Sequence, residues 1–255
     1  MRKRKYRYKQ QSNYMIYLFV LLVGFLIGIS VEYSICYEPQ SIQPVVIYKK
    51  SSDTYSIAEI SLAAVDQEGN GVITPLTVEL RPGNGKLLTN IEKLLFWIDT
   101  QYSIQIARDV AENLTQVNTS DYDLIYSIKT NATLIGGPSA GASLTVATIA
   151  ALENKTLRKD VMMTGTINPG GTIGEVGGIL EKAKAAKELG AELFIVPSGQ
   201  GTQTYLKPEE KCTKRFGFIF CETTYERVTI NIGEDVGISV IEVENIEDAV
   251  KYFIL

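Results

Sequence analysis

The chain has 255 residues, of which 45% are hydrophobic and 21% are charged, so it is long enough for one sizeable domain with a buried core. It contains no histidine, which excludes Ser/His/Asp and Cys/His catalysis and most catalytic zinc sites. Residues 1–12 hold six Lys or Arg and no acid, so the rest of the chain has 19 basic and 29 acidic side chains and a net charge of −10. An acidic body is a poor partner for nucleic acid, and we expect none.

The N-terminal region has the pattern of a membrane anchor. A basic tail at residues 1–13 is followed by 18 uncharged residues at 14–31, which as a helix would span about 27 Å. Tyrosines lie at both ends of this stretch, and the cations lie on its N-terminal side. We therefore expect a single transmembrane helix at 14–36 in the cell membrane, with the tail cytoplasmic and the remaining chain extracytoplasmic. A cleaved signal peptide is the alternative, since Gly28-Ile29-Ser30 could serve as a cleavage site.

Two other features agree with an extracytoplasmic location. Four triplets have the pattern of N-glycosylation acceptors, at Asn113, Asn118, Asn131 and Asn154. In an oxidising compartment Cys212 and Cys221, which bracket a short segment containing Gly217, could close a disulfide across a hairpin. Two unpaired thiols are the alternative. Cys36 borders the expected anchor, and no cysteine spacing typical of a metal site occurs.

The first half of the body has mainly strand signals. After a linker at 37–44, alternation of apolar and polar residues predicts strands at 45–48, 55–65 and 72–80, with turn-forming residues at 68–71. Apolar residues at 3.6-residue spacing predict a long amphipathic helix over 94–114, and a short strand follows at 121–129. An early β-meander that leads into a helix is therefore expected.

The second half alternates between helices and strands. We expect a helix at 138–153, a strand at 160–166, a glycine-rich loop, a helix at 178–189, strands at 193–197, 216–220 and 237–242, and a final helix at 247–253. This order indicates an α/β (α+β) fold around a mixed sheet, preceded by the transmembrane helix. The phosphate-loop motif G-x-x-x-x-G-K-[ST] is absent, so no ATPase is predicted.

The densest chemical signal is the segment 136–141, Gly-Gly-Pro-Ser-Ala-Gly, at the start of a predicted helix rich in small residues. Glycines allow a close approach of the backbone, and Pro138 favours a first helical turn. Ser139 falls where free N–H groups and the helix dipole favour an oxyanion, which suits a nucleophile. The alternative is that Ser139 only caps the helix.

The second signal is a lysine on the next predicted helix. Lys182 shares its face with Ala185, Ala186 and Leu189, whereas Lys184 lies within one turn of acidic residues. Only Lys182 is therefore predicted to point inward. Burial makes an ammonium costly to keep charged, so its pKa should fall and the neutral amine could act as a base. The alternative is that Lys182 keeps its charged end in water.

These motifs together resemble a known family. The Gly-Pro-Ser-Ala-Gly segment, the sequence Met163-Thr164-Gly165, and Gly177-Gly178 followed by Glu181-Lys182 are similar to the proteolytic domain of Lon proteases, which are serine peptidases with a Ser/Lys dyad. The 43-residue spacing from Ser139 to Lys182 matches the family, and residues 83–89 are similar to another of its motifs. Two departures stand out: Ile135-Gly136 replaces the Lys-Asp of many bacterial members, and Thr166 replaces the usual acid after Thr-Gly.

The resemblance implies specific roles. Ser139 would be the nucleophile and Lys182 the base, Thr164 would orient Lys182, and Gly137, Pro138 and Ala140 would support the nucleophile. No metal or cofactor is implied. The expected domain covers 45–200, and residues 201–255, which include the Cys212/Cys221 excursion, would be its C-terminal part.

The expected function is that of an ATP-independent, membrane-anchored endopeptidase acting on unfolded or flexible polypeptides. Without an unfoldase module, cleavage requires a chain that can already lie extended in the site. The resemblance also implies a homo-oligomer, a hexameric ring with enclosed active sites. A non-catalytic scaffold or binding module with the same fold is the alternative.

Overall fold

The computed structural model describes residues 17–23, 55–91, 98–128 and 137–254. The chain divides into two units, Met1–Val46 and Ile47–Leu255. In the first unit, residues 17–23 are helical. None of the helices in the described ranges is both long enough and apolar enough to cross a bilayer. The rest of the expected anchor at 14–36, the linker at 37–44 and the expected strand at 45–48 lie outside the described residues.

The second unit is built on a seven-stranded sheet with the order β11-β8-β5-β1-β2-β4-β3. Its strands are β1 (Ser56–Val65), β2 (Gly71–Pro82), β3 (Leu87–Ile91), β4 (Tyr122–Ile128), β5 (Val161–Met163), β8 (Leu193–Pro197) and β11 (Ser239–Val243). Strands β11, β8, β5 and β1 are parallel, β2 runs antiparallel to β1 and β4, and β3 is parallel to β4. The expectation of a mixed sheet is therefore confirmed.

The turn between β1 and β2 forms for the reason that its sequence suggests. Asp66 Oδ1 accepts hydrogen bonds from the backbone N–H groups of Glu68 (3.1 Å) and Asn70 (2.7 Å). Gly69 adopts φ +88°, a conformation that glycine reaches without a steric cost. The two strands then pair from Val65 opposite Gly71 to Ser56 opposite Leu80.

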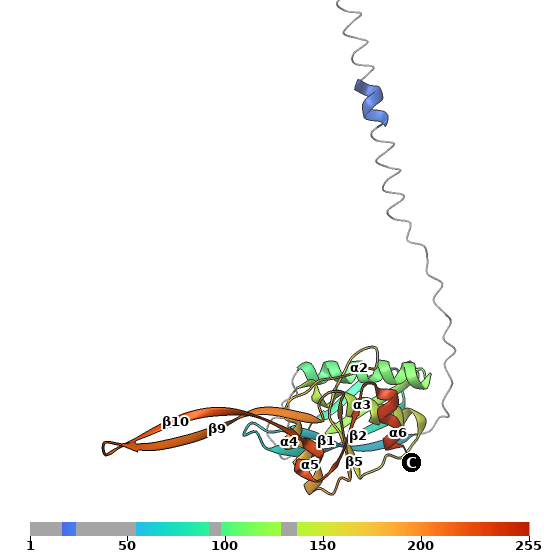
Figure 1. Cartoon of the computed structure of the whole chain (residues 1–255). Helices are drawn as coiled ribbons and strands as arrows, with labels where there is room; N and C mark the ends of the chain where they lie inside the picture. Colours follow the sequence, from blue (N-terminus) through green and yellow to red (C-terminus); the bar gives the residue numbers. More distant parts are fainter. Residues whose placement is uncertain (1–16, 24–54, 92–97, 129–136, 255) are drawn as a thin grey trace, which may run out of the picture. The chain divides into compact units, whose positions relative to one another are not determined.

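Helices cover both faces of the sheet (Figure 1). One core cluster joins the sheet to α2 (Ile98–Thr115), α3 (Gly141–Glu153) and α6 (Ile246–Phe253), and a second joins it to α4 (Ile179–Glu188) and α5 (Ile232–Val236). Side chains alternate between the two clusters along a strand, as a pleated sheet requires. Ile195 belongs to the first cluster, and its neighbours Phe194 and Val196 belong to the second.

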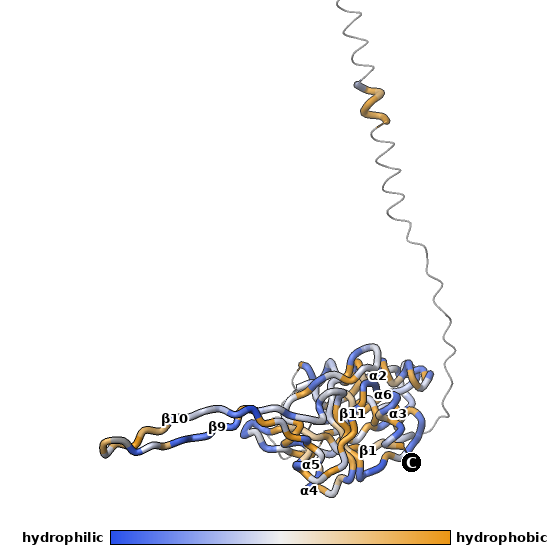
Figure 2. The backbone as a smooth tube through the Cα atoms, viewed as in Figure 1, coloured by the Kyte–Doolittle hydropathy of each residue, from blue (hydrophilic) through white to orange (hydrophobic). Residues whose placement is uncertain are grey.

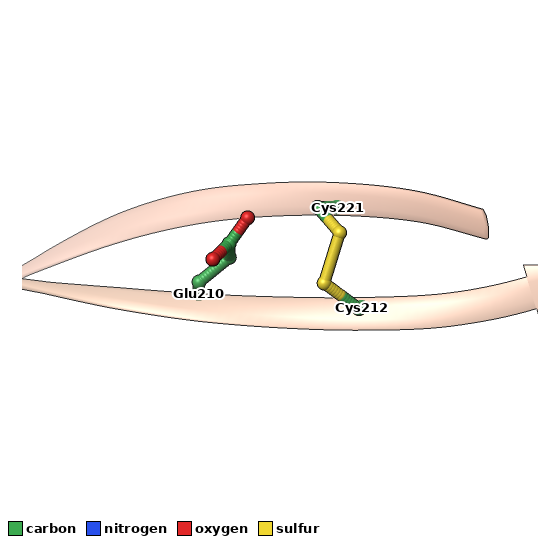
Figure 3. A group of neighbouring side chains, drawn as sticks. All are labelled: Glu210, Cys212 and Cys221. Carbon is green, nitrogen blue, oxygen red and sulfur yellow. A yellow bond between two sulfur atoms is a disulfide. The ribbon is translucent and has the colours of Figure 1, made fainter.

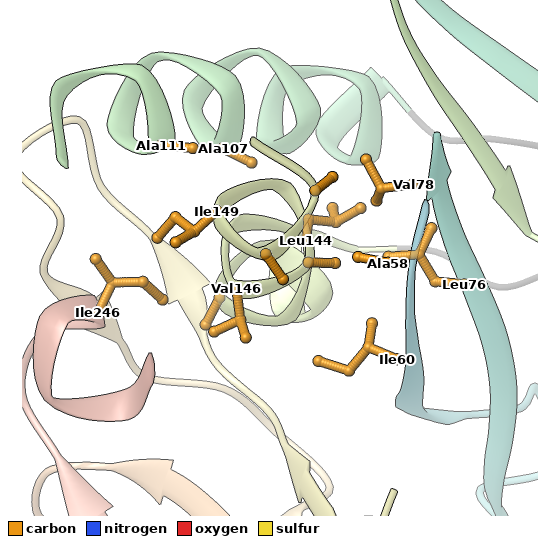
Figure 4. Packing of buried hydrophobic residues seen from close by; sticks show 14 of the residues in the cluster. Ala58, Ile60, Leu76, Val78, Ala107, Ala111, Leu144, Val146, Ile149 and Ile246 are labelled. Carbon is orange, nitrogen blue, oxygen red and sulfur yellow. The ribbon is translucent and has the colours of Figure 1, made fainter. Parts of the chain in front are cut away.

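Helix α3 lies in the middle of the larger cluster, and all of its residues except Glu153 are buried. Figure 4 shows α3 enclosed by α2, α6 and the sheet, with Leu144, Val146 and Ile149 directed into the packing. A helix that is apolar or small on every side is expected to be buried in this way. The helix that carries Ser139 at its entrance is therefore fixed by the core.

Three elements differ from the predicted ones. The strand predicted at 160–166 ends at Met163. Thr164 N still donates to Ile195 O of β8, but the next N–H, that of Gly165, leaves the sheet and donates to Ser139 O. The helix predicted from 138 begins with the short 3₁₀ turn η2 (Pro138–Ala140) before α3. Strand β3 was not predicted, since its segment was interpreted only as a family motif.

The largest difference is a long hairpin in place of the short strand predicted at 216–220. Strands β9 (Thr202–Arg215) and β10 (Phe218–Asn231) pair along their whole length and form an arm that extends from the body of the unit (Figure 1). Three smaller elements complete the fold: η1 (Thr119–Asp121), β6 (Thr166–Ile167) and β7 (Ile173–Gly174).

Cys212 and Cys221 lie opposite each other in this hairpin and form a disulfide (Figure 3). Glu210 lies beside the two sulfur atoms, which makes the group resemble a set of metal ligands. With both sulfurs bonded to each other, neither is a thiolate able to bind a metal ion. The bond therefore serves to hold the outer part of the hairpin closed.

Candidate active site

Ser139 is held at the entrance of α3 by backbone contacts on both sides. Gly137 adopts φ +101°, a conformation that only glycine reaches readily, and the chain turns there into η2. The carbonyl oxygen of Ser139 accepts from Gly165 N (2.9 Å), and Ser143 Oγ on α3 donates to Met163 O (3.2 Å). Neither η2 nor α3 has a side-chain cap. The half-buried Ser139 hydroxyl is therefore not engaged in capping, which was the alternative interpretation of this residue.

Lys182 lies on the buried face of α4, as the helical spacing predicts. Its side chain is only 3% exposed, and Ala185 and Ala186 on the same face are also buried. Lys184 is exposed, so the predicted contrast between the two lysines is confirmed. Leu189, expected on the buried face, is instead exposed, because α4 ends at Glu188 and the chain turns away there.

Thr164 connects the lysine to the serine segment. Lys182 Nζ donates to Thr164 Oγ1 (3.1 Å), and Thr164 Oγ1 donates to the carbonyl oxygen of Ser139 (3.3 Å). The threonine is buried and lies directly after β5, where its N–H still pairs with β8. The three residues that the motifs single out therefore belong to one hydrogen-bonded arrangement, although they are 25 and 18 positions apart in sequence.

Burial lowers the pKa of Lys182 from 10.5 to about 8, and the negative charge of Glu181 opposes this shift only partly. The cause is desolvation, because the ammonium form loses water that the surrounding apolar groups cannot replace. At neutral pH a lysine with this pKa is neutral in about a tenth of the molecules, whereas an unperturbed lysine is almost never neutral. The buried amine is thus able to accept a proton.

Ser139 and Lys182 line the same open cavity of about 410 Å³. Its other walls come from three places: the end of β1, the η2 turn, and the loop that leads from β6 and β7 into α4. Gly178 at the start of α4 adopts φ +67°, and a Cβ there would lie 2.5 Å from Val65 Cγ2. Glycine at this position therefore allows α4 to approach the β1 end closely enough to form the wall.

The cavity also contains a carboxylate that the sequence interpretation did not single out. Glu175 lines it together with Thr166 and is exposed to solvent. Strand β6 pairs with β7 so that Thr166 lies opposite Gly174, which places Glu175 next to the position where the Lon pattern usually has an acid. The position of Glu175 just before Val176-Gly177-Gly178 is the sequence signal that could have singled it out. That Glu175 lies near Thr166 is known only from the pairing of β6 with β7.

The remaining residues singled out in the sequence are divided between this cavity and the surface. Gly137 and Pro138 line the cavity, and Ala140 follows Ser139 at the end of η2. Asn113 and Asn154 are exposed, and Asn118 Oδ1 accepts from Ser120 N at 3.1 Å as the cap of η1. Asn131 and the segment 135–136 lie outside the described residues. The disulfide is in the arm.

Comparison with known proteins shows the family to which the chain belongs. Residues 70–232 match the family model of the Lon protease (S16) C-terminal proteolytic domain. The chain is 28% identical over 161 residues to the archaeal Lon protease of Thermococcus kodakarensis, covering 60% of this chain and 24% of that protein. It is 31% identical over 165 residues to the Lon protease of Fervidobacterium nodosum, covering 64% of this chain and 20% of that protein.

The chain thus spans a quarter or less of the length of these curated relatives. The matched region nevertheless includes most of the described sheet and every residue that lines the cavity except Val65, with Ser139, Thr164 and Lys182 inside it. The chain therefore belongs to the family of Lon protease (S16) C-terminal proteolytic domains, a family of serine peptidases.

Proposed function

We propose that this protein is a serine endopeptidase in which Ser139 is the nucleophile and Lys182 the general base. The observation that carries the proposal is the buried Lys182 amine, with its lowered pKa, in the same cavity as the Ser139 side chain. A lysine with an unperturbed pKa would be protonated at neutral pH and unable to take the serine proton. Burial of this one lysine on α4 therefore supports a Ser/Lys dyad.

The hydrogen bonds to Thr164 support a specific division of tasks. Thr164 commits its own proton to the Ser139 carbonyl oxygen, so it can only accept from Lys182. A neutral amine that donates one N–H to Thr164 keeps its lone pair for another partner. Thr164 therefore acts as a positioning residue that leaves the basic lone pair of Lys182 available to the serine hydroxyl.

In the first half of the reaction, Ser139 Oγ attacks the scissile carbonyl carbon while its proton passes to Lys182 Nζ. Backbone N–H groups in the first turn at Ser139 and Ala140 stabilise the oxyanion, because the first turns of helices leave such donors without intrahelical acceptors. The C–N bond then breaks, and Lys182 donates the proton that it took from Ser139 to the leaving amine. An acyl group remains on Ser139.

In the second half, a water molecule attacks the acyl carbon and gives a proton to Lys182. Collapse of this second tetrahedral intermediate releases the new carboxyl end, and the proton returns to Ser139 Oγ. Each proton that Lys182 accepts is passed on within the same cycle. Besides the substrate, the sequence of steps uses Ser139, Lys182, the backbone N–H groups at Ser139 and Ala140, and water.

The substrates we propose are unfolded or flexible polypeptides, cleaved without ATP. A peptide bond within a folded domain cannot lie extended beside Ser139, so the cleavage geometry selects mobile chains. The 255 residues contain no phosphate-loop motif for ATP hydrolysis. Cleavage of a disordered protein such as casein should proceed at the same rate with and without ATP.

We further propose that residues 14–36 anchor the protein in the cell membrane, with the basic tail in the cytoplasm and the peptidase outside. The support is the excess of Lys and Arg on one side of the uncharged stretch. Protease added to intact cells should degrade the body and spare the first dozen residues. Full protection of the body would refute this orientation.

A homo-oligomeric ring, a hexamer by family resemblance, is the proposed assembly. Enclosure of the active sites would restrict entry to extended chains, and a shared membrane would raise the effective concentration of protomers. Light scattering of the full-length protein in detergent should give the mass of an oligomer. A fully active monomer would show that enclosure does not restrain this peptidase.

The decisive experiment separates catalysis from a non-catalytic scaffold. Ser139→Ala and Lys182→Ala should each abolish cleavage of a fluorogenic peptide, and the double variant should lose no more, because the two groups act as a unit. Lys184→Ala changes an exposed lysine on the same helix and is the matched control. Wild-type activity in Lys182→Ala would eliminate the dyad, and an inactive wild type in this assay would favour the scaffold.

A further inference from the structure

The end of the β9–β10 arm is an apolar surface in water. Four large side chains at this end are exposed: Phe216 is 100% exposed, Phe218 70%, Ile219 69% and Phe220 58%. Figure 2 shows the same end of the arm coloured as hydrophobic, with hydrophilic stretches between it and the body. We call residues 213–220 the arm tip. A contiguous exposed apolar group of this kind marks a binding surface.

The apolar side chains of the arm tip are distributed around the hairpin. Phe218 pairs with Arg215 and Phe220 with Thr213, so both phenylalanines belong to one face of the two-stranded ribbon. Ile219 pairs with Lys214 on the opposite face, and Phe216 forms the turn itself. Docking on a flat protein surface would bury only one of these faces. A tip that is apolar on both faces and at its end suits immersion in an apolar medium.

The conformation of the turn is a second indication that the arm tip contacts a partner. Phe216 and Gly217 have φ values of +49° and +84°, as a two-residue hairpin turn of type I′ requires. Asn or Asp normally precedes the glycine there, because a bulky residue is strained at positive φ and exposed to water. A phenylalanine in this position is unfavourable in an isolated, hydrated hairpin. Such an outlier is understandable where the turn residue is needed for contact with a partner.

Charge distinguishes the arm tip from the body. Residues 211–221 contain Lys211, Lys214 and Arg215 and no acid, although residues 13–255 as a whole are strongly acidic. Acids begin again at Glu210 and Glu222, directly behind the Cys212–Cys221 disulfide. Aromatic residues next to cations are the composition that binds the headgroup and outer acyl region of anionic membranes.

We propose that the arm tip inserts into the surface of a bilayer that contains anionic lipids, to a depth limited by the acids behind the disulfide. Phe216, Phe218, Ile219 and Phe220 enter the acyl boundary, and Lys214 contacts the headgroups. The disulfide keeps the two strands together at the water boundary, so the four side chains enter as one unit. This contact is separate from the cleavage site and from the proposed N-terminal anchor.

The test uses depth-dependent fluorescence quenching, which reports on the arm tip whether or not the N-terminus is also in the membrane. Full-length Phe218→Trp and Tyr225→Trp are each mixed with vesicles of phosphatidylglycerol and phosphatidylcholine carrying bromine on their acyl chains. Tyr225 is exposed on the same hairpin behind the disulfide, so it is the matched control, and both variants share the same Trp97 background. Only the indole introduced at position 218 should lose most of its emission.

Charge variants test the headgroup contact. In the Phe218→Trp background, Lys214→Glu should reduce the quenching on anionic vesicles, and Lys207→Glu, the same change behind the disulfide, should leave it unchanged. Equal emission from Phe218→Trp with brominated and unbrominated lipid would overturn the proposal. An emission shift that depends on protein concentration and not on lipid would overturn it in favour of a second copy of the chain. Peptide cleavage by all these variants should stay at the wild-type rate.

Discussion

Lys182 Nζ and Thr164 Oγ1 are 3.1 Å apart and hydrogen-bonded, and the same threonine hydroxyl donates to the carbonyl oxygen of Ser139. The end of β5 and the buried face of α4 are thereby joined at the entrance of α3. In a buried setting, a bond of this kind fixes the direction of the amine as well as its position. The consequence is that the proposed base depends on a residue that does not itself react.

Removal of the Thr164 hydroxyl should therefore slow the reaction without preventing substrate binding. Thr164→Val has the same shape but cannot accept from Lys182, and we expect kcat to fall about 100-fold with KM little changed. Thr164→Ser keeps the hydroxyl and should recover most of the rate, which a purely structural role of the side chain would not require. Steady-state kinetics on a fluorogenic peptide measure kcat and KM for both variants. Equal rates in Thr164→Val and wild type would exclude the positioning role.

The rate should also depend on pH through the base. With the pKa of Lys182 lowered to about 8, the neutral fraction grows as pH rises, so kcat/KM should increase about tenfold per unit below pH 8 and level off above it. The profile should be the same in Lys184→Ala, whose lysine is exposed. A rate that is constant between about pH 6 and pH 9 would be incompatible with Lys182 as the base.

The same pKa shift has a consequence for stability. The unfolded chain holds the Lys182 proton up to about pH 10.5 and the folded chain only up to about pH 8, so between these values the unfolded state binds more protons. The free energy of unfolding must therefore rise with pH across this window, by about 3 kcal/mol from this residue. Below pH 8 the buried ammonium is a net cost.

Lys182→Met tests this consequence, since methionine fills a similar volume without a charge. At pH 7 the variant should be more stable than wild type by up to about 3 kcal/mol, and the difference should vanish toward pH 10.5. Urea denaturation at several pH values measures it. A variant less stable than wild type at pH 7 would mean that the ammonium is well accommodated in the folded state.

Glu175 should influence which peptides are cleaved. It is the carboxylate that lines the cavity with Ser139, and it is exposed, so a basic substrate side chain near the scissile bond would gain a weak ion pair. Exposed pairs are worth up to about 1 kcal/mol, so peptides with Lys should be cleaved up to about fivefold faster than otherwise identical peptides with Glu. Glu175→Gln should remove the difference, and Glu188→Gln, an exposed acid on α4, should retain it.

The sequence by itself determined the residues of the proposed site and most of the elements that carry them. The absence of histidine excluded an imidazole base, and helical spacing separated the buried Lys182 from the exposed Lys184. These signals are local, because a helix repeats every 3.6 residues and turn residues act through their own backbone. For the same reason the β1–β2 hairpin and the buried helix α3 could be predicted.

Only the tertiary structure decided what depends on contacts between distant segments. Strand β5 ends at Met163 because the backbone N–H of Gly165 donates to the carbonyl oxygen of Ser139. The pairing of β6 with β7 brings Glu175 beside Thr166 in the cavity. The length of the β9–β10 arm could not be predicted either. Its strands are exposed on both faces, so they lack the apolar alternation that burial of one face imposes. Pairing between strands, and not the pattern within either one, sets where these elements end and which residues meet.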